Sequence, residues 1–517
     1  MIASKAAAKS IQIQTGALFS LVQFGYFNFN LHRQRGIVPL ATKTTSCAAT
    51  SSLLISRSTS SFAYAKYLIY WRGEHKEGYS ESFRQWEFLG ALSATIATIH
   101  RVDATETYHI LERRVSFVNA FAFDPTKRSG LDLRQAVLQA GIYNTALQYM
   151  SLHDSIELRS ILTPEVMAIA TKRCALIHTL YQVLSVGMSY SELIDQSLKS
   201  RAFGDTIRSN QTNNRSWALY RHEYSFVNDY NSPRFGKNKT RSESKERAAI
   251  LALAPLVKDF GGNVNLKNPD CPIYLLEGLR DDISVDNEEL YKILCIKLSS
   301  GAKHSIMAPS SRICKTTTPL CSIAAHIVCN IAMIRDDEAV LDPFAGSAAT
   351  LLAASLIAPE AQTVGIEVVS DALLSRENIR RDFSTRGLKP PLAVIEGDVM
   401  DATVRNEARK LIGDKAFDVI VTDPPWGRRE AASKMLAVDS ALSSLIDVIK
   451  YNRLAGNPIL KKGGRLVIFQ PCHKGQRIEE LLPSDAQLQS AGLQLQDMKE
   501  QRLNDGLSRW VLSFLSV

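Results

Sequence analysis

Residues 417–427 (FDVIVTDPPWG) place an acidic and an aromatic side chain around two prolines. The apolar run before Asp423 predicts a buried strand, and the prolines restrict the following backbone to a rigid turn. An exocyclic base amine is a poor nucleophile because its lone pair is delocalised into the ring. Asp423 and the carbonyl of Pro424 can accept its two N–H groups, and Trp426 can stack on a flipped-out base. The motif therefore indicates chemistry on an amino nitrogen, with Asp423, Pro424 and Trp426 as candidate catalytic residues.

Three acidic residues, Asp342, Glu367 and Asp398, stand at or just after the ends of β-rich runs. Ligands bind at the carboxyl ends of the strands in doubly wound sheets, where Glu367 can accept from ribose hydroxyls and Asp398 from an adenine amino group. Phe344 and Gly346 lie in the short loop after Asp342, which allows close backbone approach. No phosphate-binding glycine motif accompanies these residues, so dinucleotide and ATP sites are disfavoured. Together with the amine motif, they indicate S-adenosylmethionine, with all five as candidate cofactor-binding residues.

The elements that would position these residues alternate regularly after residue 316. Expected strands cover 338–342, 363–367, 392–396, 417–422 and 464–470, and expected helices cover 348–358, 371–383 and 432–451. Such alternation predicts an α/β fold with a parallel sheet and helices on both faces. Residues 509–515 fit a closing edge strand.

The first half of the chain is less regular. A strand is expected at 64–70 and a helix at 82–99, and residues 103–170 are mostly helical in pattern. Residues 201–247 carry ten Lys or Arg against five acidic residues, interleaved with aromatic residues (Trp217, Tyr220, Tyr224, Phe226 and Tyr230). This composition suits backbone contacts to RNA with aromatic stacking, and equally a solvated loop beside a partly buried strand.

Most of the net charge of +9 belongs to the N-terminus, because residues 1–73 contain eight Lys or Arg and no acidic residue. That segment has the composition of an organellar transit peptide, and a disordered extension is the alternative. No stretch of about 18 apolar residues predicts a membrane-spanning helix. The eight cysteines include no C-x-x-C pair, so we expect reduced thiols and no metal-binding residues in this chain.

Residues 342–347 and 423–427 resemble class I S-adenosylmethionine-dependent methyltransferases that modify amino nitrogen. Together with residues 264–270 (VNLKNPD) and 67–70 (YLIY), the chain resembles the eukaryotic THUMP-type tRNA (guanine-10-N2) methyltransferase family. The resemblance implies a class I methyltransferase doubly wound sheet preceded by a ferredoxin-like unit and a THUMP-like RNA-binding domain. The expected divisions are a transit-like or disordered segment at 1–62, a ferredoxin-like region with an insertion at 63–170, a THUMP-like domain at 171–280 and a methyltransferase domain at 281–517.

The resemblance further implies an enzyme that transfers a methyl group from S-adenosylmethionine to the N2 amino group of a guanine in tRNA. The family's base-binding acid falls on Asp423, its stacking aromatic on Trp426 and its ribose-binding acid on Glu367. A small zinc-binding activator subunit is the implied partner, and the cytoplasm the implied compartment unless the N-terminal segment directs the protein to mitochondria or plastids. Two alternatives stay open. One is a methyltransferase for rRNA or DNA amino groups, and the other is a non-catalytic RNA-binding protein with a degenerate fold, because Ala348 and Cys321 replace a family glycine and acid.

Overall fold

The computed structural model describes most of the chain from residue 66 onward. The described ranges are 66–72, 81–122, 147–152, 160–229, 232–237, 243–280, 291–314, 319–368, 375–426 and 441–517. The segment predicted to be transit-like or disordered, residues 1–62, lies outside them. Within the described ranges, no helix combines the length and apolar character needed to cross a membrane.

The C-terminal half contains a seven-stranded sheet with the strand order β11-β10-β9-β12-β13-β15-β14. Its strands are β9 (Ala339–Asp342), β10 (Gln362–Glu367), β11 (Ala393–Glu396), β12 (Phe417–Thr422), β13 (Leu460–His473), β14 (Leu493–Asn504) and β15 (Leu507–Ser516). The pairings from β11 through β13 are parallel, and β15 runs antiparallel to both of its neighbours. The expected α/β fold with a parallel sheet is confirmed.

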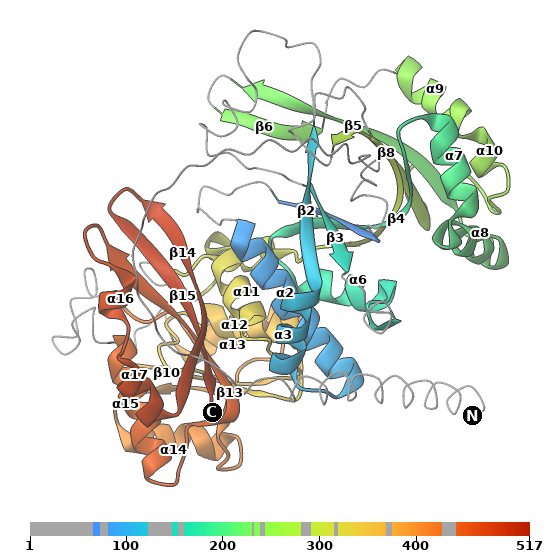
Figure 1. Ribbon diagram of the computed structural model, residues 1–517. Helices are drawn as coiled ribbons and strands as arrows, with labels where there is room; N and C mark the ends of the chain where they lie inside the picture. Colours follow the sequence, from blue (N-terminus) through green and yellow to red (C-terminus); the bar gives the residue numbers. More distant parts are fainter. Residues whose placement is uncertain are drawn as a thin grey trace, which may run out of the picture.

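Helices precede, connect and follow the parallel strands. They are α11 (Ser322–Ile331), α12 (Ala349–Ile357), α13 (Arg376–Ser384), α14 (Ala402–Leu411), α15 (Ala441–Leu454), α16 (Ile478–Leu481) and α17 (Asp485–Ala491). In Figure 1 the yellow helices α11 and α12 lie between the sheet and the blue N-terminal helices, whereas α14, α15 and α17 lie at the lower left. The strand order reverses between β9 and β12, which makes the ends of these two neighbours the expected ligand site.

The closing strand of this sheet is β14, not β15, so the prediction of an edge strand at 509–515 is wrong. Leu493–Asn504 pairs antiparallel along β15 and takes the outer position. The side chain of Asn504 accepts a hydrogen bond from the Gly506 amide (2.8 Å), which supports the tight turn between the two strands. The sequence of β14 hides this strand because it is rich in Gln and charged residues, which are uncommon in strands.

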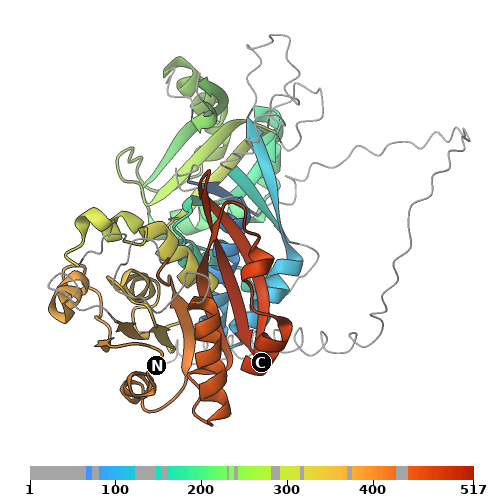
Figure 2. The same ribbon diagram turned by 90° about the vertical axis from the view of Figure 1, so that its left-hand side faces the viewer.

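The N-terminal half forms an eight-stranded sheet with the order β2-β3-β1-β4-β8-β7-β5-β6. Its strands are β1 (Tyr67–Trp71), β2 (Val115–Ala122), β3 (Leu147–Leu152), β4 (Ile177–Gly187), β5 (Trp217–Asp229), β6 (Ser232–Lys237), β7 (Cys271–Arg280) and β8 (Tyr291–Ser300). The green and cyan strands of this sheet occupy the upper part of Figure 2, above the orange and red elements of the other sheet. The boundary expected after residue 280 falls between β7 and β8, two strands that pair side by side.

Helices of the N-terminal half flank its strands. They are α2 (Glu81–His100), α3 (Ala104–Arg114), α6 (Pro164–Arg173), α7 (Tyr190–Lys199), α8 (Arg201–Asn213), α9 (Glu243–Ala252) and α10 (Ala254–Val257). The strand expected at 64–70 and the helix expected at 82–99 are confirmed as β1 and α2. The mostly helical interpretation of 103–170 is wrong for β2 and β3, which pair with each other across residues 115–120 and 147–152.

A buried carboxylate on α2 joins the two halves. Glu87 accepts hydrogen bonds from the amides of Ala175 (2.6 Å) and Leu176 (2.9 Å), and from the side-chain amide of Asn330 on α11 (3.1 Å). Burial raises the pKa of Glu87 to about 7, and the three hydrogen bonds act against this rise. One hydrophobic core cluster also runs from the N-terminal helices into the seven-stranded sheet. The N-terminal helix α2 is thus packed as part of the C-terminal half.

The contact between α2 and α11 depends on Gly90. A Cβ atom at this position would lie 2.3 Å from the backbone oxygen of Asn330. We expect G90A to lower the free energy of unfolding by about 2 kcal/mol or more, because the two helices would have to separate. Urea unfolding followed by circular dichroism measures this change.

The matched control is G204A, a Gly→Ala change in helix α8. A Cβ atom there would contact only the Arg208 side chain, at 3.7 Å. Since alanine favours helix formation over glycine by about 1 kcal/mol, G204A should be neutral or stabilising. Equal effects of the two substitutions would contradict the proposed close packing at Gly90.

Candidate active site

Asp342 lies at the end of β9, buried beneath the loop that follows. Its Oδ1 accepts hydrogen bonds from the Thr422 hydroxyl (2.6 Å) and the Phe344 amide (3.1 Å), and its Oδ2 accepts from the Thr350 hydroxyl. Burial raises the pKa of Asp342 to about 7, the hydrogen bonds lower it, and the neighbouring Asp423 raises it further. Both oxygens are therefore engaged by protein donors, so the carboxylate shapes the loop that carries Phe344.

Glu367 ends β10, the strand next to β9. Its Oε2 accepts a hydrogen bond from the Gly346 amide at 2.6 Å, so the carboxylate ties the glycine loop to this strand end. The loop packs tightly on β10, because a Cβ atom on Gly365 would lie 2.8 Å from the Ala345 methyl group. Glu367 is partly exposed, which leaves it accessible at the edge of the sheet.

Asp398 follows β11 and is exposed, with its Oδ1 accepting from the Met400 amide at 2.9 Å. Register places Glu367 beside Glu396 at the end of β11, and places Gly365 beside Asp342. The structure thus brings the three predicted acids to one edge of three adjacent strands. Their roles in binding a cofactor stay predictions.

Asp423 follows β12, which pairs with β9 on the side opposite β10. Its Oδ1 accepts a hydrogen bond from the indole Nε1–H of Trp426 at 3.1 Å. Burial raises the pKa of the Asp423 carboxyl, while the charge of Arg509 and the indole hydrogen bond lower it. Pro424, which follows Asp423 in the sequence, is buried. The acid and the aromatic residue predicted to act together are therefore in direct contact.

Sequence reasoning missed a second set of side chains around the glycine loop. The buried Arg312, in the segment that leads out of the eight-stranded sheet, donates to the Ser347 hydroxyl (3.3 Å) and to the Ser347 carbonyl. It also pairs with the buried Asp382 of α13 at 3.2 Å. Asp382 additionally accepts from the amides of Ile313 (2.6 Å) and Cys314 (2.9 Å). No local motif surrounds Arg312, so no sequence signal connected it with the loop.

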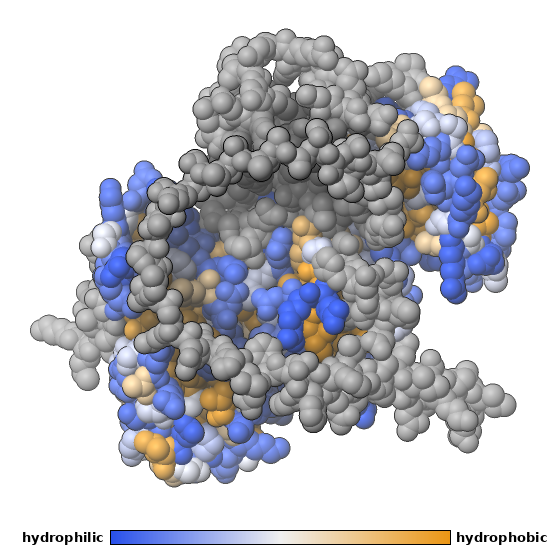
Figure 3. All heavy atoms as spheres, in the orientation of Figure 1, coloured by the Kyte–Doolittle hydropathy of each residue, from blue (hydrophilic) through white to orange (hydrophobic). Residues whose placement is uncertain are grey.

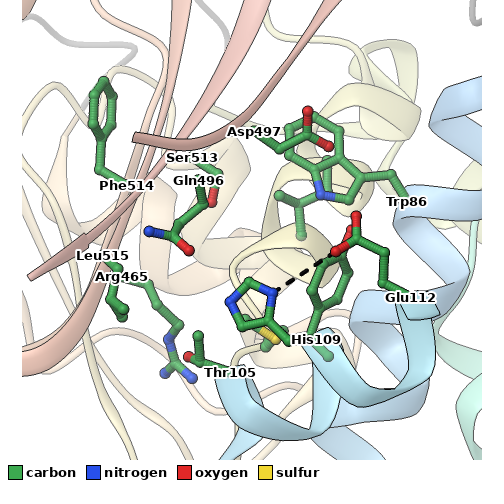
Figure 4. Close-up of a pocket in the computed structure, with 13 residues that line it drawn as sticks. Trp86, Thr105, His109, Glu112, Arg465, Gln496, Asp497, Ser513, Phe514 and Leu515 are labelled. Atoms are coloured by element: carbon green, nitrogen blue, oxygen red, sulfur yellow. Dashed lines mark ion pairs between the residues drawn. The ribbon is translucent and has the colours of Figure 1, made fainter. Parts of the chain in front are cut away.

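A pocket of about 40 Å³ lies elsewhere, between α2, α3 and strands β13 to β15 (Figure 4). Trp86, His109, Arg465 and Asp497 are among its lining residues, and His109 faces Glu112 at 3.7 Å. Arg465 lies near the start of β13, whereas Asp423 follows the end of β12. The pocket is therefore separate from the strand ends that carry the predicted site.

The basic segment 201–247 is only partly available for RNA. Arg208 and Arg201 both lie within 4 Å of Asp205, and Arg221 pairs with the buried Glu277. Of the predicted stacking residues, Trp217 packs on Phe260 (5.4 Å) and Tyr220 on Tyr274 (5.3 Å). The side chains of Tyr224, Phe226 and Tyr230 lie outside the described part. Figure 3 shows a mainly hydrophilic surface with scattered apolar side chains over α7 to α10. Leu198 of α7 and Leu251 of α9 are exposed.

Comparison with known protein families adds to this geometry. Residues 309–444 match the family UPF0020, described as the RMKL-like methyltransferase domain. This segment is a methyltransferase domain. It contains β9 to β12 with the strand ends that carry Asp342, Glu367, Asp398 and Asp423. Among the described residues, no group of three or more His, Cys, Asp or Glu side chains is arranged to hold a metal ion.

Curated relatives confirm the resemblance to tRNA (guanine-N2) methyltransferases. The tRNA (guanine(10)-N(2))-methyltransferase TRMT11 of Xenopus laevis is 26% identical over 283 residues, which cover 48% of this chain and 56% of the relative. The human protein of the same name is 24% identical over 322 residues, which cover 55% of this chain and 65% of the human protein. The chain thus spans somewhat more than half the length of the relatives it matches. The solved structure of TrmN from Thermus thermophilus matches with 16% identity over 78% of this chain and 100% of that chain, with a TM-score of 0.32.

The methyltransferase domain should become less stable as Asp342 ionises. Because its pKa is about 7 in the folded chain against 3.8 ordinarily, the folded state binds more protons than the unfolded state between these values. The stability of the wild type relative to D342N should therefore fall as the pH rises from 4 to 7, by up to about 4 kcal/mol. Urea unfolding of both proteins at pH 5 and pH 8 measures the difference.

The matched control is D398N, at the exposed carboxylate that follows β11. Because this side chain is not buried, D398N should not reproduce the change expected of D342N. A D342N protein whose relative stability is constant with pH would contradict the buried, raised-pKa state of Asp342.

Proposed function

We propose that the protein is an S-adenosylmethionine-dependent tRNA (guanine-N2) methyltransferase. By resemblance the methylated base is guanine 10. The contact between Asp423 and Trp426, at the end of β12 and next to the acid-lined ends of β9 and β10, carries the proposal. The printed names of the relatives support the same activity, and rRNA or DNA amino groups are the alternative substrates.

The chemistry of the side chains fits the proposed cofactor. Glu367 offers carboxylate oxygens to ribose hydroxyls, and Asp398 offers an exposed carboxylate to an adenine amino group. Phe344, in the loop after Asp342, is a partly exposed aromatic side chain. Gly346 provides the loop backbone at the strand edge and is held there by Glu367. S-adenosylmethionine, when bound, supplies a methyl group on a positively charged sulfur atom, which becomes a neutral thioether as the methyl group leaves.

Asp423 and Pro424 then act on the guanine amine. The Asp423 carboxylate and the Pro424 carbonyl accept its two N–H bonds, which favours a tetrahedral nitrogen whose lone pair can form the new N–C bond. After the bond forms, the nitrogen carries one proton in excess, and Asp423 is placed to take it. The indole of Trp426 donates to Oδ1 of Asp423 in this structure, so the amine would be accepted by Oδ2. Holding both reactants in one orientation supplies much of the lowering of the barrier.

The partners we propose are tRNA and a small zinc-binding activator subunit. Exposed Arg215 and Arg247 remain in the basic segment as candidate phosphate contacts. The activator is supported by the family resemblance, and co-purification from the native source tests it. We propose the cytoplasm as the compartment, with mitochondria or plastids as the alternative if residues 1–62 act as a transit peptide.

A non-catalytic scaffold is the second candidate, and Ala348 is the observation that favours it. This residue begins α12 with φ 60° and ψ 36°, a left-handed conformation that costs about 1–2 kcal/mol for a residue other than glycine. Its methyl group is fully buried and belongs to the hydrophobic core cluster. The substitution therefore strains the turn, whereas the methyl group adds to the core. Cys321 caps α11 by accepting from the Ile323 amide at 3.3 Å.

Substitution of Asp423 tests the proposed function. D423A and D423N should each lower methyl transfer to tRNA by at least about a thousandfold, because the amine loses its charged acceptor. Binding of tRNA should stay within about twofold of the wild type, measured by filter binding at fixed salt. The nucleoside formed is identified by mass spectrometry of tRNA from cells with and without the protein. Normal methylation by D423N would contradict the mechanism, and loss of a modified nucleoside from rRNA alone would select that substrate.

Removal of the Glu367 charge tests the cofactor site. E367Q should weaken S-adenosylmethionine binding by about tenfold or more in calorimetric titration, since charged acceptors form stronger hydrogen bonds than neutral ones. The control is E396Q, which removes an exposed carboxylate beside Glu367 at the end of β11. Equal affinities of E367Q and the wild type would contradict the assigned role. Absence of binding to the wild type at millimolar ligand would favour the scaffold.

A further inference from the structure

Arg509 lies at the candidate active site although it is remote from the catalytic motif in sequence. It sits on β15 opposite Pro471 of β13, and only 6% of it is exposed. Its guanidinium carbon lies 4.3 Å from the ring centre of Phe469 and 5.8 Å from that of Trp426. The cation thus contacts one aromatic side chain of the sheet and the predicted base-stacking residue together.

The neighbouring strand fixes the orientation of this guanidinium. Gln501 of β14 lies opposite Arg509, is fully buried, and accepts a hydrogen bond from its Nε at 2.6 Å. A guanidinium group is planar and donates in fixed directions, so this bond sets the plane that meets the aromatic rings. An ammonium group at the same place could not reproduce that arrangement.

Burial and two neighbouring side chains act on the ionisation of Asp423. Burial raises the pKa of its carboxyl, whereas the charge of Arg509 on β15 and the hydrogen bond from the Trp426 indole lower it. Asp423 in turn raises the pKa of Asp342 at the end of β9. Burial therefore favours the protonated form of Asp423, and Arg509 is the cation that opposes this effect. A protonated Asp423 would be a weaker hydrogen-bond acceptor for an amine than the carboxylate is.

We propose that Arg509 is a positioning residue of this site, which holds the Trp426 indole beside Asp423 and supplies the positive charge that keeps the Asp423 carboxylate ionised. The inference deepens the proposed function and rests on it for the identity of the reaction. It assigns two separable properties to one side chain, a charge and a flat stacking surface.

The pH dependence of methyl transfer separates these properties. In R509M the acid limb of kcat/KM against pH should move upward by about one unit, which is about a tenfold loss of rate below the limb. In R509K the limb should stay at the wild-type position because the charge remains. The KM for tRNA should nevertheless rise several-fold in R509K, since the ammonium group cannot stack on Trp426. An unmoved acid limb in R509M overturns the inference, as does a limb in R509K that moves as far as in R509M.

Two further variants distinguish the charge effect of Arg509 from a general loss of stability. R465M removes an arginine near the start of β13 that is only 5% exposed and pairs with Glu338. It should destabilise the fold without moving the acid limb. Q501E leaves Arg509 in place and adds a carboxylate beside it, so the limb should move upward as in R509M. A limb that moves equally in R465M, or that stays unmoved in Q501E, would count against the assigned charge effect.

A spectroscopic measurement keeps the inference independent of catalysis. The indole of Trp426 donates a hydrogen bond to Asp423, so the fluorescence of this indole should report protonation of the Asp423 carboxyl. The Trp426 signal is obtained by subtracting the pH titration of W426F. The midpoint of this signal should lie at higher pH in R509M than in the wild type. A shifted midpoint without any methyl transfer would support Arg509 while refuting the proposed function. If the wild type transfers methyl groups normally and the R509M midpoint does not shift, the role of Arg509 is refuted and the proposed function is not.

Discussion

The buried carboxylate of Asp342 is the group on whose hydrogen bonds the C-terminal half depends. It accepts from Thr422 on β12, from Thr350 on α12 and from the backbone of the loop between β9 and α12. A carboxylate buried without donors would be costly, so these elements are held at the positions that satisfy it. Thr422 immediately precedes Asp423, and the same bonds therefore set both the loop after β9 and the start of the turn that carries Asp423.

A similar set of buried hydrogen bonds joins the N-terminal half to the elements around the seven-stranded sheet. Glu87 brings together α2, the start of β4 and α11 through backbone and side-chain donors. Arg312 extends the connection, because it links the segment after β8 to Ser347 in the glycine loop and to Asp382 on α13. The elements resembling an RNA-binding region thus share a core and a set of buried hydrogen bonds with the elements that carry the proposed chemistry.

Patterns within short stretches predicted much of the fold. Strands β9 to β12 are short apolar runs between turns, and the acids at their ends were found because strand ends are visible in sequence. The strand β14 was missed because its polar residues give no such pattern, and its place at the edge depends on pairing with β15. Strands β2 and β3 were read as mostly helical, since their pairing partners come from distant parts of the chain. Pairing of this kind follows from topology, which local propensity does not contain.

The sequence by itself determined the chemical groups of the site: a carboxylate on a rigid turn, an aromatic neighbour, and acids at the ends of successive strands. Tertiary structure decided what each group does within the fold. It engaged both oxygens of Asp342 with protein donors, placed the indole of Trp426 on Asp423, and brought Arg509 from the far end of the chain to the same turn. The physical reason is that residue type and spacing specify local backbone and chemistry, whereas burial, charge coupling and stacking arise between strands whose order only the folded sheet defines.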